Sequence, residues 1–117
     1  MTLTERRVGE VTLLELKGRL VFDDGDMVLR QRVGELVAEG RVKIVLNLRD
    51  VTLLDSCGVG ELVARLVSVR QKGGDVKLLH LSPRSHRVMD ISRLLGVFDT
   101  FDSETAAVAS FTMPAGS

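Results

Sequence analysis

The sequence predicts one mixed α/β domain, with a four- to five-stranded sheet and about four helices. Short apolar runs of strand length alternate along it with segments of helical period. The chain has 117 residues, enough for one domain, and 44% of them are hydrophobic. A hairpin pattern precedes the alternation. The expected order is therefore β-β-α-β-α-β-α-β-α, with right-handed crossovers.

The first two strands are expected in residues 3–8 ("LTERRV") and 10–18 ("EVTLLELKG"), joined by a tight turn. The second strand should end at Gly18. Residues 26–40 then have helical period, with a stop at Gly40. The apolar face of that helix comprises Leu29, Val33, Leu36 and Val37.

The next strand is expected in residues 42–48 ("VKIVLNL"), a continuous apolar run typical of a strand covered on both faces. A second helical segment follows, and Gly73 and Gly74 close it. Its apolar positions are Val59, Leu62, Val63, Leu66 and either Val69 or Arg70. Residues 76–81 ("VKLLHL") then predict another buried strand.

Residues 82–96 predict a third helix, with Ser82 as N-cap, Pro83 in the first turn and Gly96 as the stop. Residues 97–101 should form a short strand and residues 103–110 a last helix. The domain is expected to cover residues 1–112, and residues 113–117 to form a flexible tail.

Composition excludes several classes of function. The 16 basic and 16 acidic residues leave no excess charge for a phosphate backbone or an anionic membrane surface. Aromatic residues are only 3%, too few for stacking on nucleic-acid bases. The single cysteine, Cys57, fits a reducing compartment, and the sequence has no apolar stretch of membrane-spanning length. We expect no signal peptide in its first residues. We expect a cytoplasmic protein with no nucleic-acid partner and no membrane insertion.

The most informative stretch is residues 51–63, "VTLLDSCGVGELV". An apolar run stops there at Asp55, Ser56 and Cys57, and helical spacing restarts at once. The junction follows a strand, so it should lie at the carboxyl edge of the sheet, where functional sites gather. Three interpretations compete: a helix cap made by Asp55 or Ser56, a catalytic nucleophile, or a serine that another protein modifies.

Catalysis by Ser56 or Cys57 finds little support. The hydrolase pattern G-x-S-x-G fails because Leu54 stands two residues before Ser56. The candidate bases are His80, inside an apolar strand, and His86, on a polar helix face. A cysteine phosphatase would need an arginine six residues after Cys57, where the chain has valine. We therefore expect a small, partly buried Cys57 and no enzyme.

No cofactor or metal is expected. Gly58 and Gly60 supply only the first half of a dinucleotide fingerprint, and close packing is the commoner role of such glycines. One cysteine and two dispersed histidines make no zinc site. The acidic cluster of Asp23, Asp24 and Asp26 is expected to form a loop and the N-terminal cap of the first helix.

A serine at a helix N-terminus has one further property. Its hydroxyl lies at the positive end of the helix dipole. A phosphate group there, with about −1.5 to −2 charges, would be tolerated by the fold. It would still disrupt a protein–protein contact made over the same surface. Ser56 is thus a candidate switch that leaves its own domain folded.

Three stretches resemble the STAS domain, and within it the bacterial anti-sigma factor antagonists. They are residues 14–20 ("LELKGRL"), residues 43–63 with "NL" followed by "DSCGVG", and residues 73–101 with "SP" at the start of a helix. The likeness covers about residues 3 to 112. It implies a STAS-like domain that binds a partner and is not an enzyme.

The resemblance also implies a partner switch that regulates sigma-factor-dependent transcription. An anti-sigma factor with serine kinase activity would bind the unmodified chain and phosphorylate Ser56, and a metal-dependent serine phosphatase would restore the serine. Asp55 would support the loop of Ser56, while Cys57, Gly58 and Gly60 would shape the docking surface. The alternative is a STAS scaffold or regulatory module, without phosphorylation, in a signalling assembly or a transport system.

The chain departs from the family pattern at two places. Cys57 replaces the commoner serine or threonine. The acidic residue that usually follows G-x-L and faces the partner is replaced by Val21, in a loop about one residue longer than usual. We expect Asp23 or Asp24 to take over that contact.

Overall fold

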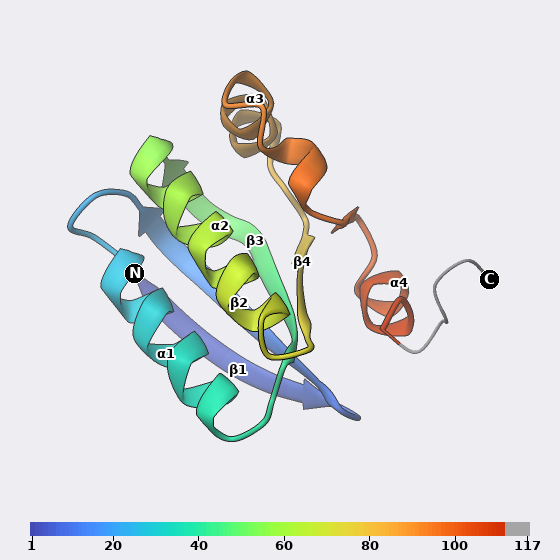
Figure 1. The fold of residues 1–117 in the computed structure, drawn as a ribbon. Helices are drawn as coiled ribbons and strands as arrows, with labels where there is room; N and C mark the ends of the chain where they lie inside the picture. Colours follow the sequence, from blue (N-terminus) through green and yellow to red (C-terminus); the bar gives the residue numbers. More distant parts are fainter. Residues whose placement is uncertain (112–117) are drawn as a thin grey trace.

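The five strands form one sheet in the order β1-β2-β3-β4-β5, in a computed structural model that describes residues 1–111 (Figure 1). The element order confirms the prediction, with a short 3₁₀ helix added. The elements are β1 (Thr2–Val8), β2 (Val11–Leu20), α1 (Asp26–Ala38), β3 (Lys43–Leu54), α2 (Ser56–Arg70), β4 (Asp75–Leu79), α3 (Pro83–Ile91), η1 (Leu95–Val97), β5 (Thr100–Phe101) and α4 (Glu104–Ala109). The expected tail, residues 113–117, lies outside the described residues.

The sheet is mixed. β1 and β2 pair as an antiparallel hairpin, and β2, β3, β4 and β5 are parallel neighbours. Because the carboxyl ends of parallel strands lie at one edge of a sheet, the connections that leave β2 and β3 emerge side by side. The final pair of their register is Leu20 with Leu54. Two loops that are far apart in the sequence therefore meet at this carboxyl edge.

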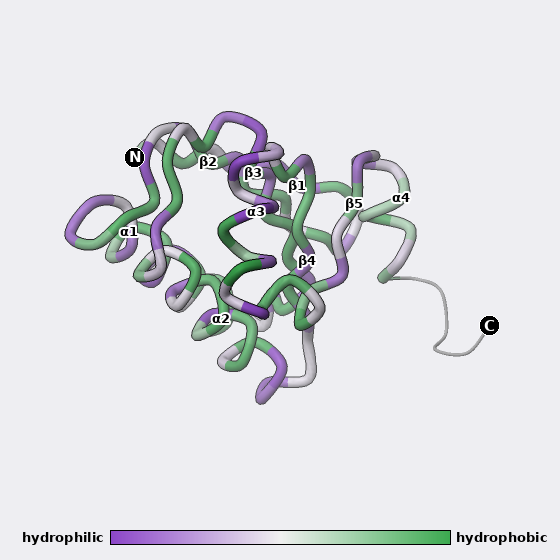
Figure 2. The backbone as a smooth tube through the Cα atoms, turned by 90° about the horizontal axis from the view of Figure 1, so that it is seen from above, coloured by the Kyte–Doolittle hydropathy of each residue, from purple (hydrophilic) through white to green (hydrophobic). Residues whose placement is uncertain are grey.

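The main core lies between one face of the sheet and the helices. In Figure 1, α1 and α2 lie side by side across this face, and Met89 brings α3 into the same cluster. Leucine and valine dominate the cluster, as the scarcity of aromatic residues predicts. α4 closes a smaller cluster around Val45 and Ala107 on the opposite face. Figure 2, seen from above, shows α4 set apart from α1 and α2.

The predicted buried face and stop of α1 and the predicted cap of α3 are confirmed. Leu29, Val33 and Leu36 of α1 are buried, and Gly40 follows the helix with a φ of 79°. Glycine adopts this left-handed backbone conformation more readily than other residues, and the conformation commonly ends a helix. Ser82 caps α3 by accepting a hydrogen bond from the Ser85 backbone N–H at 3.1 Å. Among residues 1–111 there is no helix long and apolar enough to cross a membrane.

Two strands are longer than predicted. β2 continues through Gly18 to Leu20, and β3 continues six residues beyond Leu48 to Leu54. The pairing crosses two register irregularities in β2, one on each side of Gly18, whose φ is 111°. A glycine therefore bends this strand without ending it. The consequence for the site is that β3 ends directly at the junction.

Two other boundaries were wrong. α3 ends at Ile91, not at Gly96, because Arg93 takes the left-handed conformation with a φ of 59° and Gly96 lies inside η1. His80 was expected inside a strand, but β4 ends at Leu79. His80 lies just beyond it with a φ of 57°, and its backbone N–H donates to the Phe101 carbonyl at 2.9 Å.

The core assignment predicts the effect of truncating α2. Leu62 is fully buried, whereas Val67 on the same helix is 48% exposed. We expect Leu62→Ala to lower the free energy of unfolding by about 2–5 kcal/mol through lost burial and a cavity. Val67→Ala should change it by less than about 0.5 kcal/mol. Urea denaturation of both variants measures the difference, and equal costs would show that the helix face is misassigned.

Candidate functional site

The candidate site consists of two connections at the carboxyl edge of the sheet. One is the turn of residues 21–25 between β2 and α1, hereafter the turn. The other is the junction of residues 54–58 between β3 and α2, hereafter the junction. The paired strand ends Leu20 and Leu54 place them next to each other. Both predicted groups of candidate residues, the acidic cluster and the D-S-C-G stretch, therefore belong to one surface region.

Asp55 fastens the two connections together. Its Oδ1 accepts a hydrogen bond from the Gly58 N–H at 2.8 Å, which makes it the N-cap of α2. Its Oδ2 accepts a second hydrogen bond from the Phe22 N–H in the turn at 3.2 Å. The choice between Asp55 and Ser56 as the cap is thereby settled for Asp55. A single carboxylate both starts the helix and fixes the turn.

Ser56 is the first residue of α2, and its side chain is exposed. Within residues 1–111, no hydrogen bond joins the Ser56 hydroxyl or the N–H groups of Ser56 and Cys57 to a partner. Free N–H groups at a helix start carry the positive end of the dipole and favour an anion. The hydroxyl is therefore open to solvent, and the backbone around it favours a negative charge.

The small residues after Ser56 divide into two kinds. Cys57 is exposed, so the expectation that it is partly buried was wrong. Gly60 is also exposed, and a Cβ added there would meet nothing within 4 Å. Both residues lie on the first turn or so of α2, beside Ser56. Because both residues are small, they leave the space around the hydroxyl open.

Gly58 has a packing role. It is buried, and a Cβ added there would lie 2.0 Å from the backbone oxygen of Leu20. Only glycine allows α2 to approach the end of β2 this closely. Gly58 thus holds the junction against the end of β2.

The acidic residues of the turn have different surroundings. Asp23 is exposed and takes the left-handed conformation with a φ of 60°, which aspartate tolerates better than most residues. Asp24 Oδ2 accepts a hydrogen bond from Arg19 Nε at 3.0 Å, and its Oδ1 lies 3.5 Å from the N-terminal amine. The Arg19 hydrogen bond lowers the pKa of Asp24. Of these two candidates, Asp23 has the carboxylate that is open to a partner.

The predicted acidic cap of α1 is absent. The N-cap is Gly25, which has a φ of 92° and makes no side-chain hydrogen bond to the helix. Asp26 is instead the first helical residue, and its Oδ1 accepts from the Met27 N–H at 2.9 Å. A Cβ at Gly25 would lie 2.5 Å from the Arg19 backbone oxygen, so close packing of the turn excludes an aspartate there.

Sequence reasoning missed two residues near this edge. Phe22 is 72% exposed at the tip of the turn. Glu61 is buried between α1 and α2, where Oε2 accepts a hydrogen bond from Arg30 Nη2 at 2.9 Å. Arg65 Nε lies 2.8 Å from Oε1 without hydrogen-bond alignment. The Glu61–Arg65 spacing of four is visible in the sequence, but the contact with Arg30 depends on how the helices pack.

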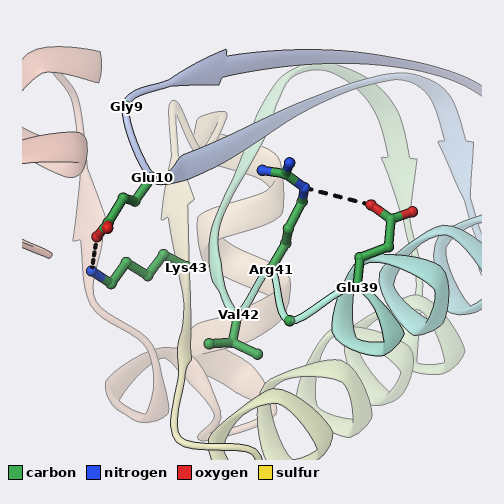
Figure 3. Close-up of a pocket in the computed structure, with 7 residues that line it drawn as sticks. Gly9, Glu10, Glu39, Arg41, Val42 and Lys43 are labelled. Atoms are coloured by element: carbon green, nitrogen blue, oxygen red, sulfur yellow. Dashed lines mark hydrogen bonds and ion pairs between the residues drawn. The ribbon is translucent and has the colours of Figure 1, made fainter.

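A cavity of about 440 Å³ lies at the opposite edge, near the start of β3 (Figure 3). Its charged groups already form ion pairs with one another. Lys43 Nζ lies 2.7 Å from Glu10 Oε2, and Arg41 Nε lies 3.5 Å from Glu39 Oε2. Because these charges are already paired, they are poorly placed to bind a charged ligand. In the described part of the chain, no cluster of three metal-ligating side chains occurs.

The chain is similar in sequence to a known domain family and to named bacterial regulators. The family model "STAS domain" matches residues 3–107. The chain is 31% identical over 99 residues to the anti-sigma F factor antagonist of Paenibacillus polymyxa, covering 84% of each. It is 36% identical over 72 residues to the anti-sigma-B factor antagonist of Bacillus subtilis, covering 62% of this chain and 65% of the relative.

Solved structures show the same fold. A putative anti-sigma factor antagonist from Thermotoga maritima superposes with a TM-score of 0.87 at 23% identity, covering 95% of each chain. The Bacillus cell fate determinant SpoIIAA in its phosphorylated form superposes with a TM-score of 0.73 at 23% identity, covering 93% of this chain and 98% of that one.

The two glycines of α2 give a matched test of the site geometry. Gly58→Ala should destabilise the fold by about 1–3 kcal/mol, because its Cβ collides with the backbone of Leu20. Gly60→Ala should be neutral or stabilising by up to about 1 kcal/mol, since alanine favours a helix and the position is open. Urea denaturation of both variants measures this. Full stability of Gly58→Ala would contradict the close approach of α2 to β2.

Proposed function

Because the chain belongs to the STAS domain family, and within it to the anti-sigma factor antagonists, we propose that it binds an anti-sigma factor and that phosphorylation of Ser56 ends this binding. Antagonists of this family are regulators and not enzymes. The Ser56 hydroxyl is thus the substrate of another protein. The partner is an anti-sigma factor with serine kinase activity, and a metal-dependent serine phosphatase reverses the modification. The exchange takes place in the cytoplasm and regulates sigma-factor-dependent transcription.

One observation carries the proposal: the helix is capped by Asp55, so the exposed hydroxyl of Ser56 has no structural duty. If Ser56 capped its own helix, modification would change the group that holds the helix start, whereas here the cap is a separate residue. Here the hydroxyl oxygen is available to attack the γ-phosphorus of ATP held by the kinase. The bond from that phosphorus to ADP breaks, and the hydroxyl proton passes to a base of the kinase.

The docking surface comprises the exposed residues around this hydroxyl. Asp23, Cys57 and Gly60 lie open beside Ser56, whereas Asp24, Asp55 and Gly58 hold the turn and the junction together. The functional residues expected from the sequence therefore divide into contact residues and supporting residues.

Electrostatics explains why modification would release the partner. Phosphate adds about −1.5 to −2 charges next to the carboxylates of Asp23 and Asp55. The helix N-terminus compensates part of this within the chain, by about 0.3–1 kcal/mol. A partner surface that fits a neutral hydroxyl has no group placed there to offset the added negative charge. Disturbing a central buried polar contact costs about 2–5 kcal/mol, or 30- to several-thousand-fold in affinity.

Two substitutions of Ser56 test the switch. Ser56→Asp places a fixed charge at the helix start and should abolish detectable binding to the kinase partner without lowering the melting temperature. Ser56→Ala should bind permanently, because it cannot be phosphorylated. Gln71→Glu is the matched control, since it adds one negative charge at the other end of α2.

Calorimetric titration against each serine-kinase anti-sigma factor of the same genome, with and without ATP, measures these affinities. Binding of Ser56→Asp as tight as that of the wild type would refute the switch. If Gln71→Glu also lost binding, an added negative charge would weaken binding wherever it lies on α2, and the specific role of Ser56 would be refuted.

A further inference from the structure

We propose that Phe22 is the apolar anchor with which the chain docks on its anti-sigma factor, and that Asp55 positions it there. This inference rests on the proposed function and adds a contact that the family resemblance does not supply. The occupant it implies is a hollow on the anti-sigma factor with an apolar floor and a basic rim.

The exposure of Phe22 has no structural explanation within the chain. Of the four phenylalanines, Phe98 is buried, and Phe101 and Phe111 flank Lys77, whose Nζ lies 5.7 and 4.7 Å from their ring centroids. Phe22 is 72% exposed at the tip of a tight turn, where nothing in the backbone requires an aromatic side chain. Aromatic side chains in this state are the typical anchors of protein interfaces.

The turn holds Phe22 in a defined place. Val21 and Asp24 exchange two backbone hydrogen bonds of 3.0 Å across the tip, and Val21 is buried. The Phe22 N–H donates to Asp55 Oδ2, and Asp55 immediately precedes Ser56. The backbone of Phe22 is thus tied to the residue next to Ser56, and a protein that docks over both connections would contact Phe22 as well. Such preorganisation lowers the entropic cost of binding.

The charge of the residues beside Phe22 indicates the chemistry of the partner surface that faces it. Asp23, next to Phe22, is exposed and has no ion pair within residues 1–111, whereas Asp24 is matched by Arg19. A partner hollow that receives Phe22 thus needs a basic group at its rim for Asp23. A second copy of this chain is a poor occupant, because a symmetric contact would bring the Asp23 carboxylates of both copies close together.

Asp55 is a positioning residue in this scheme, and Asp55→Asn isolates its role. Asparagine caps helices as well as aspartate does, so its oxygen continues to accept from the Gly58 N–H. Its NH₂ group cannot accept from the Phe22 N–H, which loses its acceptor. We expect faster hydrogen exchange at the Phe22 amide with unchanged exchange at Gly58.

The test is calorimetric titration of unphosphorylated variants against each purified serine-kinase anti-sigma factor of the same genome. Phe22→Ala should weaken binding by about 30-fold or more, as expected for an interface anchor, with an unchanged melting temperature. Val97→Ala is the control. Val97 is also apolar and exposed, and its carbonyl accepts from Arg70 Nη2, at the far end of α2. This variant should bind within about threefold of the wild type.

The outcomes separate the two proposals. If the wild type binds a kinase and is released by phosphorylation of Ser56, but Phe22→Ala binds equally well, the anchor is overturned and the switch stands. If the wild type binds no anti-sigma factor, the proposed function fails and the anchor fails with it. If Asp55→Asn leaves the exchange of the Phe22 amide unchanged, the positioning role is overturned.

Discussion

The carboxylate of Asp55 is the interaction on which the carboxyl edge depends. One oxygen starts α2 at Gly58 and the other holds the turn at Phe22, so two segments 33 residues apart share one anchor. Gly58 permits this arrangement because it brings α2 against the backbone oxygen of Leu20. With Asp55 engaged in both contacts, the hydroxyl of Ser56 is left free. The fold therefore exposes this hydroxyl without using it as a structural contact.

The proposed switch would change binding without a change of fold, because the carboxyl edge is supported by the core. The elements that meet at the edge are fixed from behind by fully buried residues, among them Leu20, Val59 and Leu62. A phosphate on Ser56 would act on the surface in front of them, where the exposed Asp23 already contributes negative charge. In the proposed switch, the change in binding energy would therefore be electrostatic and local, with no large rearrangement of the chain.

Local patterns in the sequence predicted the element order, the buried face of α2, the cap at Ser82 and the place of Ser56. These features depend on spacing and on residues close in the chain. The full lengths of β2 and β3 could not be predicted, because their last pairs form across the irregularities around Gly18. The bond from Phe22 to Asp55 and the pair of Arg30 with Glu61 likewise join segments that only the tertiary fold brings together. The replacement of an acidic cap by Gly25 follows from crowding against Arg19, which no local pattern reveals.

The most direct measurement is mass spectrometry of the chain after incubation with its serine-kinase anti-sigma factor and ATP. The account predicts a gain of about 80 Da, the mass of one phosphoryl group, confined to the peptide that contains Ser56. It also predicts an unchanged melting temperature for the modified protein, since the hydroxyl has no structural duty. A phosphate on another residue, or a modified chain that unfolds, would contradict it.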